Sequence, residues 1–111
     1  MGTSALAITD DHRDLADAAN GQLRRLKSRA AARATLDQDA AGATHPADLW
    51  AAAVGVGWQG LAIAEEHGGS GFGLPELAVV LEAQGRELCP GPFLPSSSAA
   101  VVIDRCATDT L

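Results

Sequence analysis

The sequence predicts an all-α fold, a helical bundle of about four helices that forms a single domain over residues 1–111. Apolar residues, most of them alanine and leucine, make up 47% of the chain, whereas aromatic residues make up only 4% and tyrosine is absent. Alanine loses no side-chain entropy on entering a helix, so an alanine-rich core favours closely packed helices. Apolar residues also recur at spacings of three and four, the period of a helix that buries one face.

The first helix is expected to begin near Thr9 and to run at least as far as Ala30. Thr9 can accept hydrogen bonds from the free amides of the first turn. Aspartates at positions 10, 11 and 14 suit the positive end of the helix dipole. The apolar stripe of this helix consists of Leu15, Ala19, Leu23, Leu26 and Ala30.

Basic residues gather in the C-terminal half of this expected helix, namely Arg24, Arg25, Lys27, Arg29 and Arg33. The helix dipole favours cations there, which explains most of the cluster. A solvated face, a contact with another domain and a binding surface remain open as its role. The net charge of −6 argues against nucleic acid as a partner, because nucleic acid attracts proteins through lysines and arginines that neutralise phosphates.

A polar, acidic connection over Leu36 to Thr44 leads to the second helix. This helix is expected to start at Thr44 or His45, with Pro46 in the first turn, where its missing N–H costs nothing. Its buried face consists of Leu49, Trp50, Ala53 and Val54, and two glycines, Gly55 and Gly57, end it. The glycine-rich stretch that follows, residues 58–73, is expected to be an ordered loop held by Trp58, Leu61 and Ile63 packing inward.

The third helix is expected over Pro75 to Leu88. Prolines at positions 90, 92 and 95 then predict a non-helical segment from Cys89 to Pro95. Ser96, Ser97 and Ser98 offer caps for a fourth helix from about Ala99 to Cys106, with Val101, Val102 and Ile103 as its hydrophobic body. No stop signal precedes Leu111, so the segment is expected to be cut from a longer protein.

No reaction chemistry is expected from this chain by itself. The glycine run from Gly68 to Gly73 departs from the dinucleotide-binding pattern, because Leu74 stands where the third glycine would be, and it is interpreted as a tight turn. Glu65, Glu66 and His67 lack a second histidine or cysteine at ligand spacing, which favours a solvated loop over a metal site. We therefore predict no catalytic, metal-binding or cofactor-binding residue.

The two cysteines, Cys89 and Cys106, have no CxxC spacing, so a reduced pair in a cytoplasmic protein is expected. Cys89 lies between apolar residues and prolines, where a thiol acts as a small hydrophobe. No apolar run approaches the ~20 residues that a membrane-spanning helix requires, so no membrane association is expected.

An ordered series of motifs spans residues 49–100, about half of the chain. It contains Leu49-Trp50, Gly57-Trp58-Gln59-Gly60-Leu61, the acidic pair Glu65-Glu66 before the glycine run, Gly85-Arg86-Glu87-Leu88 and Pro90-Gly91-Pro92-Phe93. This series resembles the N-terminal signature of the acyl-CoA dehydrogenase family. The chain departs from the family pattern at Ala64, where a proline is usual before the acidic pair.

The resemblance implies an FAD-dependent oxidoreductase of fatty acid or lipid metabolism that introduces an α,β double bond into acyl-CoA thioesters. In that scheme a carboxylate removes the α-proton while the β-hydrogen leaves as hydride to the flavin. The family's enzymes add a middle β-domain and a C-terminal helical domain, which hold the flavin and carry the catalytic glutamate. We therefore expect this chain to be inactive alone, to bind no FAD by itself, and to have the remaining domains or a partner subunit as partners, in an oligomer.

By position, the resemblance implies that the exit of the third helix and the start of the fourth line part of the acyl-chain pocket, through Phe93, Leu94, Ser96 and Ser97. The alternative is that these residues merely leave one helix and cap the next. A second hypothesis for the whole chain is a stand-alone helical interaction module derived from this domain. The dehydrogenase hypothesis expects an exposed apolar surface where the other domains pack, whereas the module hypothesis does not.

Overall fold

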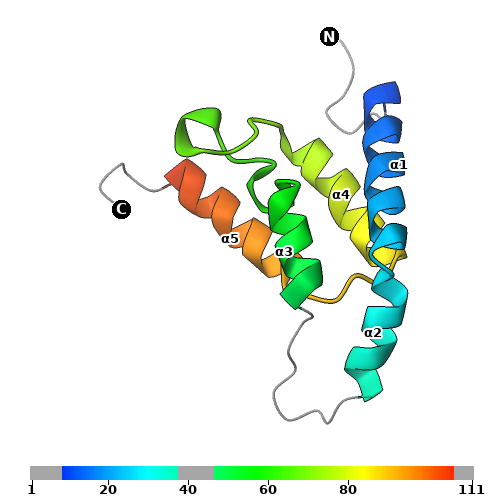
Figure 1. Ribbon diagram of the computed structural model, residues 1–111. Coiled ribbons are helices and arrows are strands. Elements are labelled where there is room, and N and C mark those ends of the chain that lie inside the picture. The colour runs from blue at the N-terminus through cyan, green and yellow to red at the C-terminus, as the bar shows by residue number, and fades with distance from the viewer. Residues whose placement is uncertain (1–8, 38–46, 107–111) are drawn as a thin grey trace.

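The computed structural model describes residues 9–37 and 47–106, and in these residues it contains helices and no strand (Figure 1). The α-helices are α1 (Asp10–Arg25), α2 (Ser28–Asp37), α3 (Ala47–Gly55), α4 (Leu74–Arg86) and α5 (Phe93–Cys106). Two 3₁₀ turns, η1 (Trp58–Gly60) and η2 (Glu65–His67), lie between α3 and α4. This architecture confirms the predicted all-α class. None of the helices in the described part is long and apolar enough to cross a membrane.

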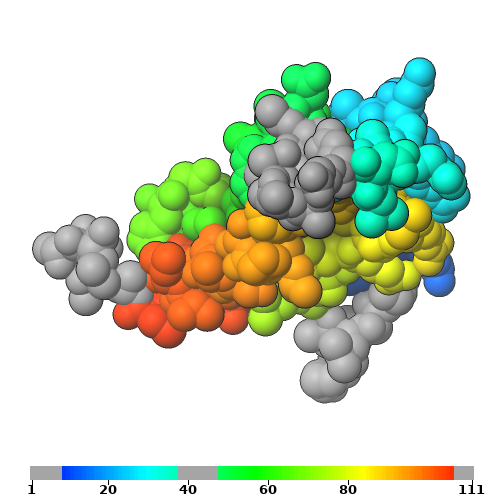
Figure 2. Space-filling model, turned by 90° about the horizontal axis from the view of Figure 1, so that it is seen from below, coloured from blue at the N-terminus to red at the C-terminus, as the bar shows by residue number. Residues whose placement is uncertain are grey.

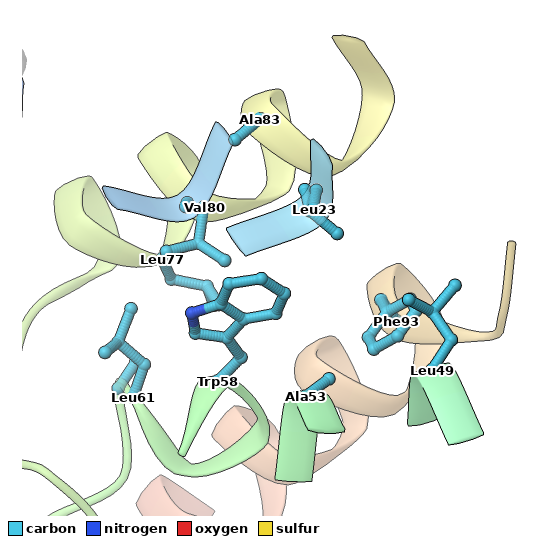
Figure 3. Packing of buried hydrophobic residues seen from close by; sticks show 11 residues of the cluster. Leu23, Leu49, Ala53, Trp58, Leu61, Leu77, Val80, Ala83 and Phe93 are labelled. Atoms are coloured by element: carbon cyan, nitrogen blue, oxygen red, sulfur yellow. The ribbon is translucent and has the colours of Figure 1, made fainter. Parts of the chain in front are cut away.

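Trp58 lies at the centre of one continuous hydrophobic core (Figure 3). Helices α1 and α4 pack side by side, and Leu23 of α1 and Val80 of α4 are 0% and 1% exposed. Ala53 of α3 and Phe93 of α5 complete the core on the other side of the indole ring. A tryptophan from a short turn therefore joins the α1–α4 pair to α3 and α5.

The first turns of α1 and α4 share one capping contact, in which the side chain of the third helical residue accepts from the N-cap amide, and they are joined to each other. The Thr9 side chain accepts a hydrogen bond from the amide of His12 (3.2 Å), and the Thr9 amide donates to Nδ1 of His12 (3.3 Å). At α4 the amide of Gly73 donates to Oε1 of Glu76 (2.8 Å). Because Nδ1 of His12 accepts, its ring proton is on Nε2, which donates to Oε2 of Glu76 over 2.6 Å. The Gly73 amide, followed by His12, lowers the pKa of Glu76.

The first predicted helix is in fact two helices. α1 ends at Arg25, Lys27 has a left-handed backbone with φ of +55°, and α2 begins at Ser28. Ser28 is 1% exposed and its hydroxyl donates to the carbonyl of Glu87 over 2.7 Å, which requires the chain to turn inward there. The prediction that Ala30 belongs to the buried stripe is wrong, because Ala30 is exposed and α2 directs Ala31 towards the core instead.

The predicted start of the second helix lies outside the described residues, which resume with α3. Leu49 and Ala53 are buried and Trp50 is partly buried, as predicted. Val54 is 52% exposed, so its predicted burial is wrong: it follows Ala53 by one residue and points roughly 100° away around the helix. Gly57 has a left-handed backbone with φ of +83°, and the helix has ended before it, as predicted.

The last helix begins six residues earlier than the predicted start at Ala99, because α5 starts at Phe93 and includes Pro95. Pro95 lies in the first turn, where a backbone N–H would have no helical partner, so its ring breaks no hydrogen bond. The amide of Ser96 already donates to the carbonyl of Pro92 (3.1 Å). The three serines are therefore inside α5 and do not cap it.

Candidate functional site

Helix α5 has one face fixed inside the domain. Phe93 is 4% exposed and packs against Trp50 of α3, with ring centroids 5.0 Å apart and planes tilted by 37°. Ser97, one turn later, is also buried, and Val101 packs against the core. Near the end of the helix, Asp104 binds the loop that precedes α4. The inner face is thus held along the whole length of α5.

The opposite face of α5 is exposed and mostly apolar. Leu94, Val102 and Ile103 are 61%, 60% and 62% exposed. We call this surface the outer α5 face, and it consists of Leu94, Pro95, Ser98, Ala99, Val102, Ile103, Arg105 and Cys106. Figure 2 shows α5, in orange to red, uncovered along one side of the molecule. Contiguous exposed apolar side chains of this kind are typical of an interaction surface.

The residues proposed from the sequence for an acyl-chain pocket do not share one face. Phe93 and Ser97 lie together on the inner face, Leu94 lies on the outer face, and Ser96 is half-buried. The sequence interpretation treated Val102 and Ile103 as hydrophobic body and missed their exposure. The sequence did contain a signal for this exposure, because three consecutive apolar residues such as Val101, Val102 and Ile103 cannot all point to the same side of a helix.

The glycine-rich loop uses its amides internally. Four consecutive amides donate to carbonyls of the preceding turn: Gly69 to Ala64 (3.1 Å), Ser70 to Gly60 (3.0 Å), Gly71 to Ile63 (2.9 Å) and Phe72 to Leu61 (3.0 Å). At Gly69 a Cβ atom would lie 2.2 Å from the Ile63 carbonyl oxygen, so only glycine allows this close approach. These amides cannot also bind a phosphate, so the loop does not fit the pyrophosphate of a flavin and supports the interpretation as a tight turn.

Asp104 fastens this loop to α5. Its carboxylate accepts a hydrogen bond from the amide of Ala64 (3.2 Å) and lies 2.5 Å from Nδ1 of His67. The hydrogen bond with His67, followed by that with Ala64, lowers the pKa of Asp104. Glu65 and Glu66, the other residues weighed as metal ligands, are exposed. In the described part of the chain no three potential metal ligands gather.

Cys89 is unsuited to act as a nucleophile. It is partly buried against the core, and this burial raises the pKa of its thiol to about 11. At neutral pH the sulfur therefore remains a neutral thiol, whereas nucleophilic attack requires the thiolate. This agrees with the sequence interpretation of Cys89 as a small hydrophobe.

A buried carboxylate joins the first two helices to the end of α4. Glu87 is 3% exposed, and its two oxygens lie 2.9 Å from Nε of Arg24 and 3.0 Å from Nε of Arg29. Arg29 also donates to the carbonyl of Arg86 (3.1 Å). Burial of a charged carboxylate is costly unless it is paired, so this arrangement explains why the start of α2 is held at the end of α4.

The fold and the outer α5 face define a class of protein: a small all-helical domain with one buried core and one apolar helix face directed outwards. A family model described as the N-terminal domain of acyl-CoA dehydrogenase matches residues 9–111. The chain belongs to the acyl-CoA dehydrogenase family, in which it corresponds to the N-terminal domain. No curated protein and no solved structure matches the chain.

Proposed function

We propose that the chain acts as the N-terminal domain of an FAD-dependent acyl-CoA dehydrogenase, an enzyme of fatty acid or lipid metabolism that oxidises the α,β bond of acyl-CoA thioesters. The observation that carries this proposal is the outer α5 face, an exposed apolar surface on a helix held rigidly from behind. The flavin supplies the hydride acceptor in such enzymes. The loop amides do not fit it, so we assign flavin binding and the catalytic base to the remaining domains or to a partner subunit.

Within this proposal the outer α5 face packs against the rest of the enzyme and forms one wall of the acyl-chain pocket. Residues four apart follow one another along a helix, so Leu94, Ser98 and Val102 form one ridge. Pro95, Ala99 and Ile103 form the ridge beside it. In each ridge a small residue, Ser98 or Ala99, lies between two larger ones. The two small residues form a shallow strip across α5 against which an alkyl chain can pack.

The four residues named from the sequence then have different roles. Leu94 contacts the acyl chain directly from the outer face, and Ser96 contributes from its edge. Phe93 and Ser97, which are buried, hold α5 in position from inside the domain.

The first experiment is to determine the size of the native polypeptide in its source cells, with an antibody raised against this domain. We expect a band several times heavier than 11.3 kDa. We also expect the purified polypeptide to show flavin absorption that is bleached when acyl-CoA is added without an electron acceptor. A band at 11.3 kDa without flavin in its complexes would contradict the proposal and favour the stand-alone interaction module.

The role in the acyl-chain pocket is tested in the same native polypeptide with Ala99→Trp. A bulky side chain in the strip should lower kcat/KM for long-chain acyl-CoA roughly tenfold relative to short-chain acyl-CoA. The matched control is Ala78→Trp, at an exposed position of α4. An equal effect of Ala99→Trp on all chain lengths would mean that this face packs against protein only.

A further inference from the structure

The break between α1 and α2 changes how the positions of the basic residues are explained. The dipole of α1 accounts for Arg24 and Arg25, which lie in its last turn. Lys27 and Arg29, however, lie beyond the end of α1, at the start of α2. The positive end of the α2 dipole disfavours cations there. The α2 dipole therefore gives no reason for a cation at Arg29, and Lys27, although it directly follows the last turn of α1, is exposed to solvent.

Glu87 balances part of this charge. Both of its carboxylate oxygens are engaged, one by Arg24 and one by Arg29. The arginine side chains nevertheless remain 67% and 62% exposed, so each guanidinium still has N–H groups open to solvent, although Nη2 of Arg29 donates to the Arg86 carbonyl. In the described part of the chain no carboxylate pairs with the ammonium group of Lys27. Positive charge thus remains on this surface after the ion pairs with the buried Glu87 carboxylate have been counted.

These groups line one surface pocket of about 290 Å³, which we call the Lys27 pocket; its residues are Leu23, Arg24, Lys27, Ser28, Arg29 and Glu87. Three cations against one carboxylate leave the pocket with two net positive charges. Lys27 adopts its left-handed backbone, with φ of +55°, at the edge of this pocket.

We propose that the Lys27 pocket binds a phosphate dianion, either free or as a monoester group on a larger molecule. Two net positive charges match the charge of the dianion. Guanidinium and ammonium groups together supply the charge-assisted hydrogen bonds that phosphate oxygens accept. This proposal is independent of the dehydrogenase reaction, because it uses groups around the α1–α2 break and Glu87 at the end of α4, and none on the outer α5 face.

The test is a titration of the 111-residue chain with inorganic phosphate, followed through backbone amide shifts by NMR, against sodium chloride at matched ionic strength. We expect saturable shifts centred on Lys27, Ser28 and Arg29 that chloride does not reproduce. Lys27→Asn removes the charge and keeps a residue that tolerates the left-handed backbone. It should weaken phosphate binding roughly tenfold. The control Arg105→Gln, which removes one cation from α5, should change binding less than about twofold.

Two outcomes would overturn the proposal: shifts that chloride reproduces equally, or shifts that Lys27→Asn and Arg105→Gln reduce by the same factor. Circular dichroism of both variants checks that each remains helical. A parallel titration with methyl phosphate separates the two sources of the anion. Comparable binding of methyl phosphate assigns the pocket to a phosphate monoester, and binding of inorganic phosphate alone assigns it to the free anion.

Discussion

Asp104 makes two contacts with the same loop through one carboxylate. The Ala64 amide and the His67 imidazole both favour its charged form, and they hold its pKa below the ordinary value of 3.8. A carboxyl group with a depressed pKa in the folded state stabilises the fold at pH values above its unfolded pKa. That contribution disappears as the pH falls through the folded pKa.

The substitution Asp104→Asn should therefore lower the free energy of unfolding at neutral pH and have progressively less effect in acid. Urea titrations of both proteins between about pH 6 and pH 2 measure this difference. Glu76, whose pKa is also lowered, remains in both proteins, so its titration cancels in the comparison. A difference that does not change with pH would mean that Asp104 contributes packing and no charge interaction.

Single residues were predictable where their partners are close in sequence. Thr9 was recognised as a cap because the amide that it accepts from is three positions away. Asp104 was not singled out, because its partner His67 lies 37 positions away and only the fold brings them together. Val54 was misassigned for the same reason, since burial at a helix edge depends on what packs beside it.

At the scale of the helices, the break at Lys27 was the main surprise. Leu26 and Ala30 are four residues apart, so the apolar spacing continues across the break and periodicity gives no sign of it. The turn depends on a buried serine and on Glu87, whose carbonyl accepts from Ser28 across 59 positions. Proline was similarly misread at the start of α5, because a helix breaker is harmless in a first turn.

Lys27→Gly tests the backbone strain at this break. Glycine adopts a positive φ without steric cost, so relief of the left-handed lysine should raise the free energy of unfolding by roughly 0.5–1 kcal/mol. Arg33→Gly, at an exposed position inside α2, is the matched control and should lower it by about 1 kcal/mol. Urea unfolding of the two variants should therefore shift in opposite directions, and a shift in the same direction would exclude strain at Lys27.

At the scale of the whole molecule, composition and helical period were sufficient for the all-α class. They could not give the arrangement of α5, because an apolar helix face directed outwards has the same residue types as one directed inwards. The outer α5 face and the core differ in what packs against them. The sequence of one chain carries no information about a partner outside that chain. The two 3₁₀ turns, η1 and η2, lie in the loop that was predicted to be ordered. They follow from the packing of Trp58 and Leu61 into the core.

The continuity of the core makes its buried leucines decisive for the entire domain. Leu23 is 0% exposed in α1, so Leu23→Ala should lower the free energy of unfolding by about 2–5 kcal/mol. Leu36→Ala, at a leucine that is 84% exposed in α2, should change it by less than about 0.5 kcal/mol. Denaturant midpoints followed by helical circular dichroism measure both effects, and similar losses would contradict the stabilising role of the buried Leu23 side chain.

The bond between His12 and Glu76 has a consequence for how this domain opens locally. Helix ends normally fray independently, each exposing its own first amides to solvent. Here His12 and Glu76 each hold a backbone amide of their own helix, at Thr9 and at Gly73, and each also holds the other. Fraying at either end removes a partner from the other, so two segments separated by about half of the chain open as one unit.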